Sequence, residues 1–201
     1  MARMFLVRWR LMNKLFTSSG YVEADALNTA TGKKVDFQAL PAFLRVLLTT
    51  DGTVTKSLES FFWEPVVVEN LGQDYVALEN AAPIIDLQAG ARVLHRKVQL
   101  KGSKSQRVYT TAVSLIRAEL LDVRMREDLE AGNVGIGELL RECGLETYRE
   151  IVEFGYGGEN ENKVEINFPA TSIWRRYRII MNHQPFIQIT EEFPLAVFGP
   201  D

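Results

Sequence analysis

Two charged side chains interrupt the apolar faces of strands that the sequence otherwise predicts clearly. In the segment FIQITEEF (186–193), strand alternation places Glu191 on the same face as Ile189. In VLHRKVQL (93–100), the same alternation places Arg96 on an otherwise apolar face. An ionised group on such a face is costly to bury unless it is paired or hydrogen-bonded. Arg96 and Glu191 are therefore the first candidates for a functional site.

The alternation leaves two interpretations of Arg96 and Glu191 open. In the first, the two side chains form a buried ion pair, which adds little stability because desolvation offsets the attraction. In the second, they line one cavity, where Arg96 binds a ligand carboxylate bidentately and Glu191 handles a proton or a hydroxyl group. The neighbouring Glu192 shares a face with Gln188 and Thr190, and we expect that face to be exposed to solvent.

A glycine-rich segment precedes a predicted helix. In GNVGIG, Gly132, Gly135 and Gly137 come just before that helix, whose first N–H groups could bind an anion or a polar ligand oxygen. The segment lacks the Gly-Lys-Ser/Thr of a P-loop, and it also lacks the third glycine of a dinucleotide fingerprint. A simple turn into the helix is the favoured interpretation.

The sequence offers little for metal binding or for hydrolytic catalysis. His95 and His183 are the only histidines, and they form no HExxH pair. Cys143 is the single cysteine, which excludes an internal disulfide and a multi-cysteine metal site. The Gly-x-Ser-x-Gly elbow of many serine hydrolases does not occur. We therefore expect no metal site, with His95 on a polar face and His183 in a turn.

Helical and strand periodicities alternate along the chain in an order typical of an α+β fold. Two short helices are expected within residues 40–62, broken at Asp51 and Gly52. The other expected elements are a strand at 64–72, a hairpin at 91–116, helices at 120–132 and 136–143, a strand at 146–156, a polar surface loop at 157–172 and a hairpin at 174–193. Hairpins with helices between them predict an antiparallel sheet that carries helices on one face.

Composition and charge indicate an ordinary globular protein. The chain has 201 residues, of which 46% are hydrophobic and 24% charged, and its net charge of −3 gives no general attraction to nucleic acid. We expect one domain at 40–201 after an N-terminal extension at 1–39. Residues 1–16 predict an amphipathic helix that packs on the domain or on a partner rather than on a membrane surface. The chain contains neither the roughly 18 consecutive apolar residues of a membrane span nor a signal peptide, which predicts a cytoplasmic location.

Six segments, taken in order, resemble the chorismate pyruvate-lyase family, and more closely its divergent prokaryotic branch. The segments are TVTKSLE, RKVQL, VGIGELL, YREIVEFG, RRYRI and ITEEF. The resemblance runs from about residue 40 to residue 198. The specificity lies in the ordered set, because none of the segments is decisive alone.

The resemblance implies a fold, a reaction and a set of site residues. The fold is an antiparallel sheet with helices over it and an interior ligand cavity. The reaction uses no cofactor and converts chorismate into 4-hydroxybenzoate and pyruvate. By position, the ring-carboxylate arginine falls at Arg96, the acid/base glutamate at Glu191, a backbone amide ligand at Ile136 and a wall residue at Val54. Arg178 is open to two interpretations, a further contact with an anionic group of the substrate or an ordinary surface arginine.

The chain departs from the family pattern in ways that bear on function. Val54 stands where the best-studied branch commonly has methionine, and an acid, Glu192, follows Glu191 where an apolar residue is usual. These changes could alter the cavity or the choice of substrate, so a related hydroxybenzoate is an alternative product. Neither the pattern nor the resemblance predicts an oligomeric state.

Two further functions remain as alternatives. A similar fold serves as the small-molecule sensor of some transcription regulators, although residues 1–39 show no clear helix-turn-helix pattern to bind DNA. A catalytically silent homologue that binds an aromatic acid is the other alternative. Retention of both Arg96 and Glu191 argues against a complete loss of activity.

Overall fold

The computed structural model of the protein describes residues 26–28, 34–132, 134–157 and 169–199. The amphipathic helix expected at 1–16 lies outside these residues, as does most of the polar loop expected at 157–172. Within the expected N-terminal extension, two short strands, β1 (Ala26–Asn28) and β2 (Lys34–Asp36), form a separate antiparallel pair. The division into an extension and a domain stays a prediction.

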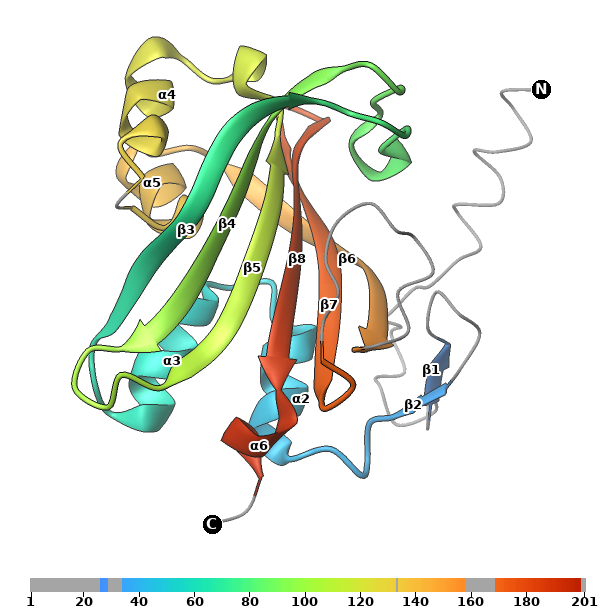
Figure 1. Ribbon diagram of the computed structural model, residues 1–201, viewed down its shortest axis with the longest axis vertical. Coiled ribbons are helices and arrows are strands. Elements are labelled where there is room, and N and C mark those ends of the chain that lie inside the picture. The colour runs from blue at the N-terminus through green and yellow to red at the C-terminus, as the bar shows by residue number, and fades with distance from the viewer. Residues whose placement is uncertain (1–25, 29–33, 133, 158–168, 200–201) are drawn as a thin grey trace.

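Six antiparallel strands form the main sheet in the order β3-β4-β5-β8-β7-β6 (Figure 1). These strands are β3 (Val66–Ala77), β4 (Arg92–Gly102), β5 (Val108–Ile116), β6 (Thr147–Tyr156), β7 (Ser172–Met181) and β8 (Gln184–Pro194). The two expected hairpins are present as β4–β5 and β7–β8. They join where β5 pairs with β8, so the C-terminal strand lies in the middle of the sheet.

The main helices pack on one face of this sheet, called the inner face here, and α2 and α3 lie behind the sheet in Figure 1. The helical elements are α2 (Ala42–Thr49), α3 (Val54–Phe62), α4 (Val123–Glu130), α5 (Ile136–Glu142), α6 (Leu195–Phe198) and the 3₁₀ turns η2 (Pro83–Ile85) and η3 (Ala118–Leu120). The expected break at Asp51 and Gly52 is confirmed, and so is the α+β class. No helix in the described ranges combines the length and the apolar character needed to cross a bilayer.

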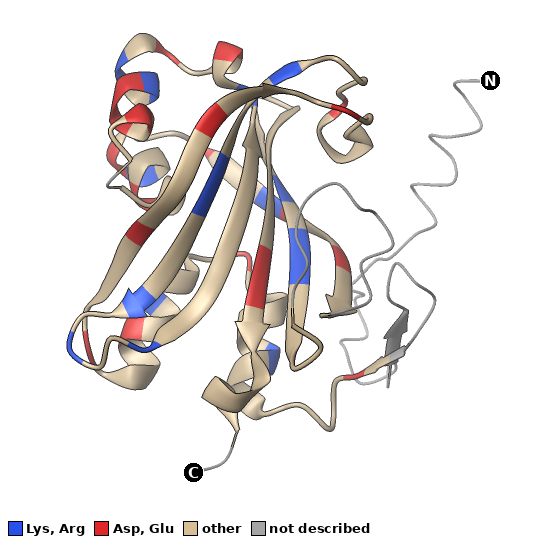
Figure 2. Cartoon of the chain, in the orientation of Figure 1, with Lys and Arg blue, Asp and Glu red and all other residues tan. Residues whose placement is uncertain are grey.

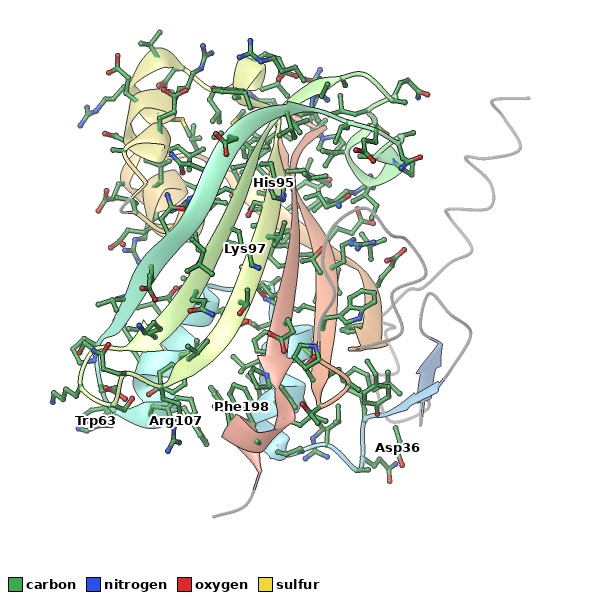
Figure 3. All side chains as sticks on the ribbon, viewed as in Figure 1. Asp36, Trp63, His95, Lys97, Arg107 and Phe198 are labelled. Atoms are coloured by element: carbon green, nitrogen blue, oxygen red, sulfur yellow. The ribbon has the colours of Figure 1, made fainter. Side chains whose placement is uncertain are left out.

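Strand β4 shows the alternation that singled out Arg96. Leu94, Arg96 and Val98 are buried on the inner face, whereas His95 and Lys97, which Figure 3 labels, are half-buried on the outer face. His183, the other histidine, lies in the turn between β7 and β8, where its φ is 62°. The sequence therefore identified the two faces of this strand correctly. In Figure 2, charged segments are visible on β4, β7 and β8 within the sheet as well as on the helices and loops around it.

The expectation that Glu192 faces solvent is wrong. Glu192 is 4% exposed, and Gln188 and Thr190 on the same side of β8 are equally buried. Alternation tells which side chains share a face, but not whether the face is covered. Here η2 packs against β8, and Trp174 stands beside Glu192 on β7. Burial raises the pKa of the Glu192 carboxyl, and a hydrogen bond from Ser172 opposes that rise.

The raised pKa of Glu192 predicts that replacing it stabilises the protein at neutral pH. A carboxyl whose pKa is higher when folded favours folding fully below its unfolded pKa of about 4.5, and this contribution is lost as pH rises through the folded value. Glu192→Gln should therefore have a larger free energy of unfolding than wild type at pH 7. The gain should vanish below about pH 4.5. Urea unfolding across this pH range measures it.

The exposed Glu146 provides the control, because Glu146→Gln should change the free energy of unfolding at pH 7 by no more than about 0.5 kcal/mol. If Glu192→Gln were less stable than wild type at pH 7, the buried carboxylate would have to make net favourable contacts, and the interpretation would be wrong.

Candidate active site

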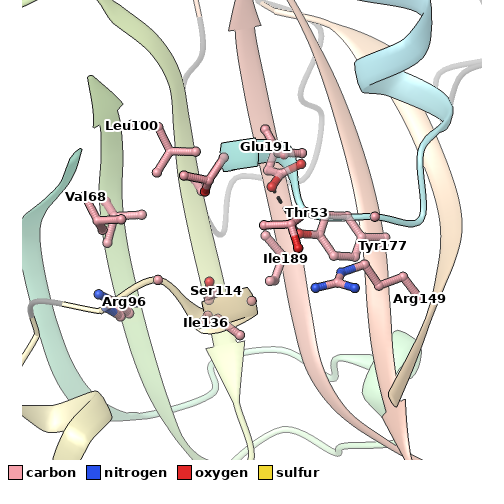
Figure 4. Close-up of a pocket in the computed structure, with 17 residues that line it drawn as sticks. Thr53, Val68, Arg96, Leu100, Ser114, Ile136, Arg149, Tyr177, Ile189 and Glu191 are labelled. Atoms are coloured by element: carbon pink, nitrogen blue, oxygen red, sulfur yellow. Dashed lines mark hydrogen bonds between the residues drawn. The ribbon is translucent and has the colours of Figure 1, made fainter. Parts of the chain in front are cut away.

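A cavity lies between the inner face of the sheet, the connection from α2 to α3, and the start of α5 (Figure 4). The cavity leaves about 70 Å³ of room for the centres of water molecules, and the space between its wall atoms is about 540 Å³ when the open mouth is included. Most of the wall is apolar and is formed by Val54, Val68, Val98, Leu100, Ile136 and Ile189. Seven polar or charged side chains also line the wall: Thr53, Thr55, Arg96, Ser114, Arg149, Tyr177 and Glu191.

Arg96 is a buried cation at one side of this cavity, and its side chain is 1% exposed. Its Nη2 donates hydrogen bonds to the carbonyl oxygens of Gly132 at 3.0 Å and of Val134 at 2.8 Å. Its Nε is buried without a hydrogen-bond partner in the described part of the chain. Burial lowers the pKa of the guanidinium. Arg96 thus fixes the glycine-rich segment and keeps a donor that a ligand anion could satisfy.

Glu191 is 5% exposed and has two partners on the neighbouring strand β7. Arg175 Nε donates to Oε2 at 2.8 Å, and the Tyr177 hydroxyl donates to Oε1 at 3.0 Å. Arg175 also donates from Nη1 to the carbonyl oxygen of Thr50 at 2.7 Å, just after α2. The carboxylate is therefore held in a fixed orientation, and each oxygen retains a lone pair toward which a ligand could donate. Burial and the Glu191 charge raise the pKa of Tyr177, against the effects of Arg175 and Arg149.

The two interpretations of Arg96 and Glu191 can now be distinguished by geometry. Both side chains line the same cavity, and Figure 4 places them on different sides of it. The partner of Glu191 in a buried ion pair is Arg175, not Arg96. The direct Arg96–Glu191 pair is therefore not formed, and a cavity separates the two groups.

The glycine-rich segment ends at this cavity. Gly132 has φ +80°, a conformation that glycine adopts without strain, and Gly135 is the N-cap of α5. Because α5 begins at Ile136, its first N–H groups have no acceptor within the helix. Ile136 lines the cavity. The segment is therefore the expected turn into a helix, and it also lies where its backbone could contact a ligand.

Known proteins resemble this chain over most of its length. The family model described as "Chorismate pyruvate-lyase Rv2949c-like" matches residues 48–198. The chain belongs to this family. A chorismate pyruvate-lyase of Mycobacterium leprae is 29% identical over 184 residues, which cover 86% of this chain and 83% of that protein. A chorismate pyruvate-lyase of Mycobacterium tuberculosis is 29% identical over 164 residues, which cover 77% of this chain and 81% of that protein.

A solved structure shares the fold at low sequence identity. PhnF from Mycobacterium smegmatis superposes with a TM-score of 0.52 at 11% identity, covering 75% of this chain and 67% of that one. Similarity at this level concerns the fold alone. It agrees with the chorismate lyase-like sheet and helices that the sequence predicted.

The four residues that the family pattern points to are brought together, whereas Arg178 lies elsewhere. Val54, Arg96, Ile136 and Glu191 all line the cavity. Arg178 lies on the outer face, where it pairs with Glu150 at 2.8 Å and donates to a backbone carbonyl of η2. Arg178 therefore does not line this cavity, which favours the interpretation that places it outside the site. Adjacent strand residues point to opposite faces, and Tyr177 takes the inner one.

Arg149, Arg175 and Tyr177 are among the site residues that sequence reasoning missed. Arg175 and Tyr177 share the inner face of β7 with Ile173 and Ile179, so their position was present in the period-2 pattern, but the arginine run obscured it. Arg149 on β6 was harder to find, because a register irregularity between Ile151 and Glu153 interrupts that strand's alternation. Among the described residues, no group of His, Cys, Asp and Glu is arranged to hold a metal ion.

Removing the cation that holds Glu191 should destabilise the fold strongly. In Arg175→Met, the buried carboxylate loses its charged partner, and breaking such a pair costs about 3–5 kcal/mol. The double variant Arg175→Met/Glu191→Gln should be more stable than the single one, because no unpaired charge remains. Urea unfolding at constant pH measures both differences.

A matched control is Arg178→Met, which removes the partly exposed pair with Glu150 and should cost no more than about 1 kcal/mol. Equal losses for Arg175→Met and Arg178→Met would contradict the assignment of Arg175 as the partner on which buried Glu191 depends.

Proposed function

We propose that the protein is a cofactor-free carbon–oxygen lyase that converts chorismate into 4-hydroxybenzoate, or a closely related hydroxybenzoate, and pyruvate. The observation that carries the proposal is the placement of Arg96 and Glu191 on separate sides of one mostly apolar cavity. Membership of the family and the names of its mycobacterial relatives support the same reaction.

The two charged groups suit the two ends of the substrate ring. In chorismate, the ring carboxylate and the ring hydroxyl lie on opposite carbons. Arg96, whose buried Nε has no hydrogen-bond partner among the described residues, would bind the carboxylate. Glu191, held by Arg175 and Tyr177, would accept the hydroxyl proton in a hydrogen bond. The apolar wall between them, which includes Val54 and Ile136, would enclose the ring and exclude water.

The reaction requires the protein mainly to orient the substrate and to stabilise the charge that develops on it. The ether C–O bond breaks, and its electron pair leaves on the enolpyruvate oxygen. The neighbouring ring carbon loses its proton, and the electrons of that C–H bond complete the aromatic ring. Enolpyruvate takes up a proton on carbon to give pyruvate, so no atom is left unbalanced. Aromatisation supplies the driving force, and the cavity contributes by orienting the ring and stabilising the departing oxygen.

The proposal is tested by incubating the purified protein with chorismate and measuring pyruvate and hydroxybenzoate together. The two products should appear in equal amounts, faster than in the absence of protein, with the ring isomer identified by chromatography. Binding of 4-hydroxybenzoate without pyruvate release above the spontaneous rate would instead support the sensor or silent aromatic-acid-binding alternatives.

Variants of Arg96 and Glu191 should separate binding from turnover. Arg96→Ala should weaken the binding of chorismate and of 4-hydroxybenzoate by about 10- to 100-fold, as expected when a charge-assisted contact is lost. Glu191→Gln keeps the shape of the side chain and should mainly lower kcat, by about a hundredfold or more. Steady-state kinetics and product titration measure these effects. Unchanged kinetics in both variants would exclude this cavity as the active site.

A further inference from the structure

A second arginine lines the same cavity on the side away from Arg96. Arg149 projects from β6, and its Nη1 donates to the carbonyl oxygen of Asp51 at 3.1 Å. Its Nη2 is so close to the start of α5 that a Cβ added at Gly137 would lie 3.3 Å from it. The half-buried guanidinium is thus held between the α2–α3 connection and α5. Figure 4 shows it beside Tyr177, across the cavity from Arg96.

Neither cavity arginine has an acidic partner within the part of the chain that the structure describes. Their known contacts are with backbone carbonyls. By contrast, the three arginines of β7 each pair with a glutamate, at 2.8 Å for Arg175, 3.0 Å for Arg176 and 2.8 Å for Arg178. Two cations that face one cavity without a counter-charge are suited to a ligand that carries two negative charges.

Other cations near the cavity do not have this property. Lys56 and Arg141 line an adjoining hollow between α3, β3 and α5. Lys56 pairs with Glu59 at 2.7 Å, and Arg141 lies 3.6 Å from Glu138. Arg149 is therefore the better candidate for a second anion contact.

The arrangement of groups on chorismate matches this second cation. The enolpyruvyl ether and the ring hydroxyl lie on neighbouring ring carbons, so the second carboxylate branches from the hydroxyl end of the ring. Glu191 marks that end in the proposed binding mode, and Tyr177 links it to the side on which Arg149 lies. A ring that is held between Arg96 and Glu191 would therefore carry its side-chain carboxylate toward Arg149.

We propose that Arg149 binds the enolpyruvyl carboxylate and so makes the site selective for the dianionic substrate over the monoanionic product. This inference rests on the proposed function. Elimination removes the second carboxylate with pyruvate, after which the hydroxybenzoate retains only its contacts at Arg96 and Glu191. Arg149 would thus strengthen substrate binding without strengthening the retention of product.

The experiment compares two ligands that differ by the second carboxylate. One is 4-hydroxybenzoate, and the other is 3-(carboxymethoxy)-4-hydroxybenzoate, whose ring is already aromatic and cannot eliminate. Isothermal titration should show that Arg149→Gln weakens the dicarboxylate by about 10- to 100-fold. The affinity for 4-hydroxybenzoate should change by less than about threefold, and Arg149→Lys should recover part of the loss because it retains the charge. With chorismate, Arg149→Gln should lower kcat/KM.

The exposed Arg124 on α4 provides the control, since Arg124→Gln removes one positive charge without touching the cavity. Equal weakening of both ligands in Arg149→Gln, or of neither, would overturn the inference. If Arg149→Gln does not fold, Arg149→Lys allows the same comparison, with a smaller difference between the losses of affinity for the two ligands. A wild-type protein that binds both ligands but releases no pyruvate would refute the proposed lyase activity. The losses of affinity for the two ligands in Arg149→Gln would still decide the role of Arg149.

Discussion

The buried carboxylate of Glu191 depends on one neighbouring strand. Arg175 and Tyr177 on β7 donate to its two oxygens, and Arg175 stands directly opposite Glu191 in the strand register. A register shift of one residue would turn both donors to the outer face and leave the acid buried without a partner. The same Arg175 donates to Thr50, so the pair also ties the α2–α3 connection to the sheet. The position of that connection, which forms one wall of the cavity, follows from this interaction.

Arg96 plays the corresponding role on the other side of the cavity. Through Gly132 and Val134 it fixes the segment that leads into α5, so a second wall depends on a second buried charge. The difference lies in how each charge is balanced. Glu191 is neutralised within the protein by Arg175, whereas the described residues provide Arg96 with carbonyl dipoles only. The protein thus retains the acid as an oriented acceptor and leaves Arg96 for an anion that is not part of the chain.

The sequence predicted the fold and half of the site because both follow from period-2 alternation. Arg96 and Glu191 were identified as misplaced charges, and each is buried on the inner face. Glu192 was misjudged because alternation assigns a side chain to a face but does not reveal what covers that face. The interpretation of Arg178 stayed open because alternation had not been used to assign Tyr177 and Arg178 to opposite faces of β7. The position of Arg149 depends on which strands become neighbours and on the irregularity in β6, and neither follows from local pattern.

The cavity therefore holds an excess of positive charge, and this has a consequence for stability as well as for binding. Arg175 and Glu191 cancel each other, which leaves Arg96 and Arg149 as two cations that line a mostly apolar space. The burial of Arg96, which lowers its pKa, works against the folded state without ligand. An anion bound at Arg96 would relieve this cost, so part of its binding free energy would come from a cost that the fold already carries. Functional sites commonly break the rules that stabilise the rest of a protein, and here the broken rule is the pairing of buried charge.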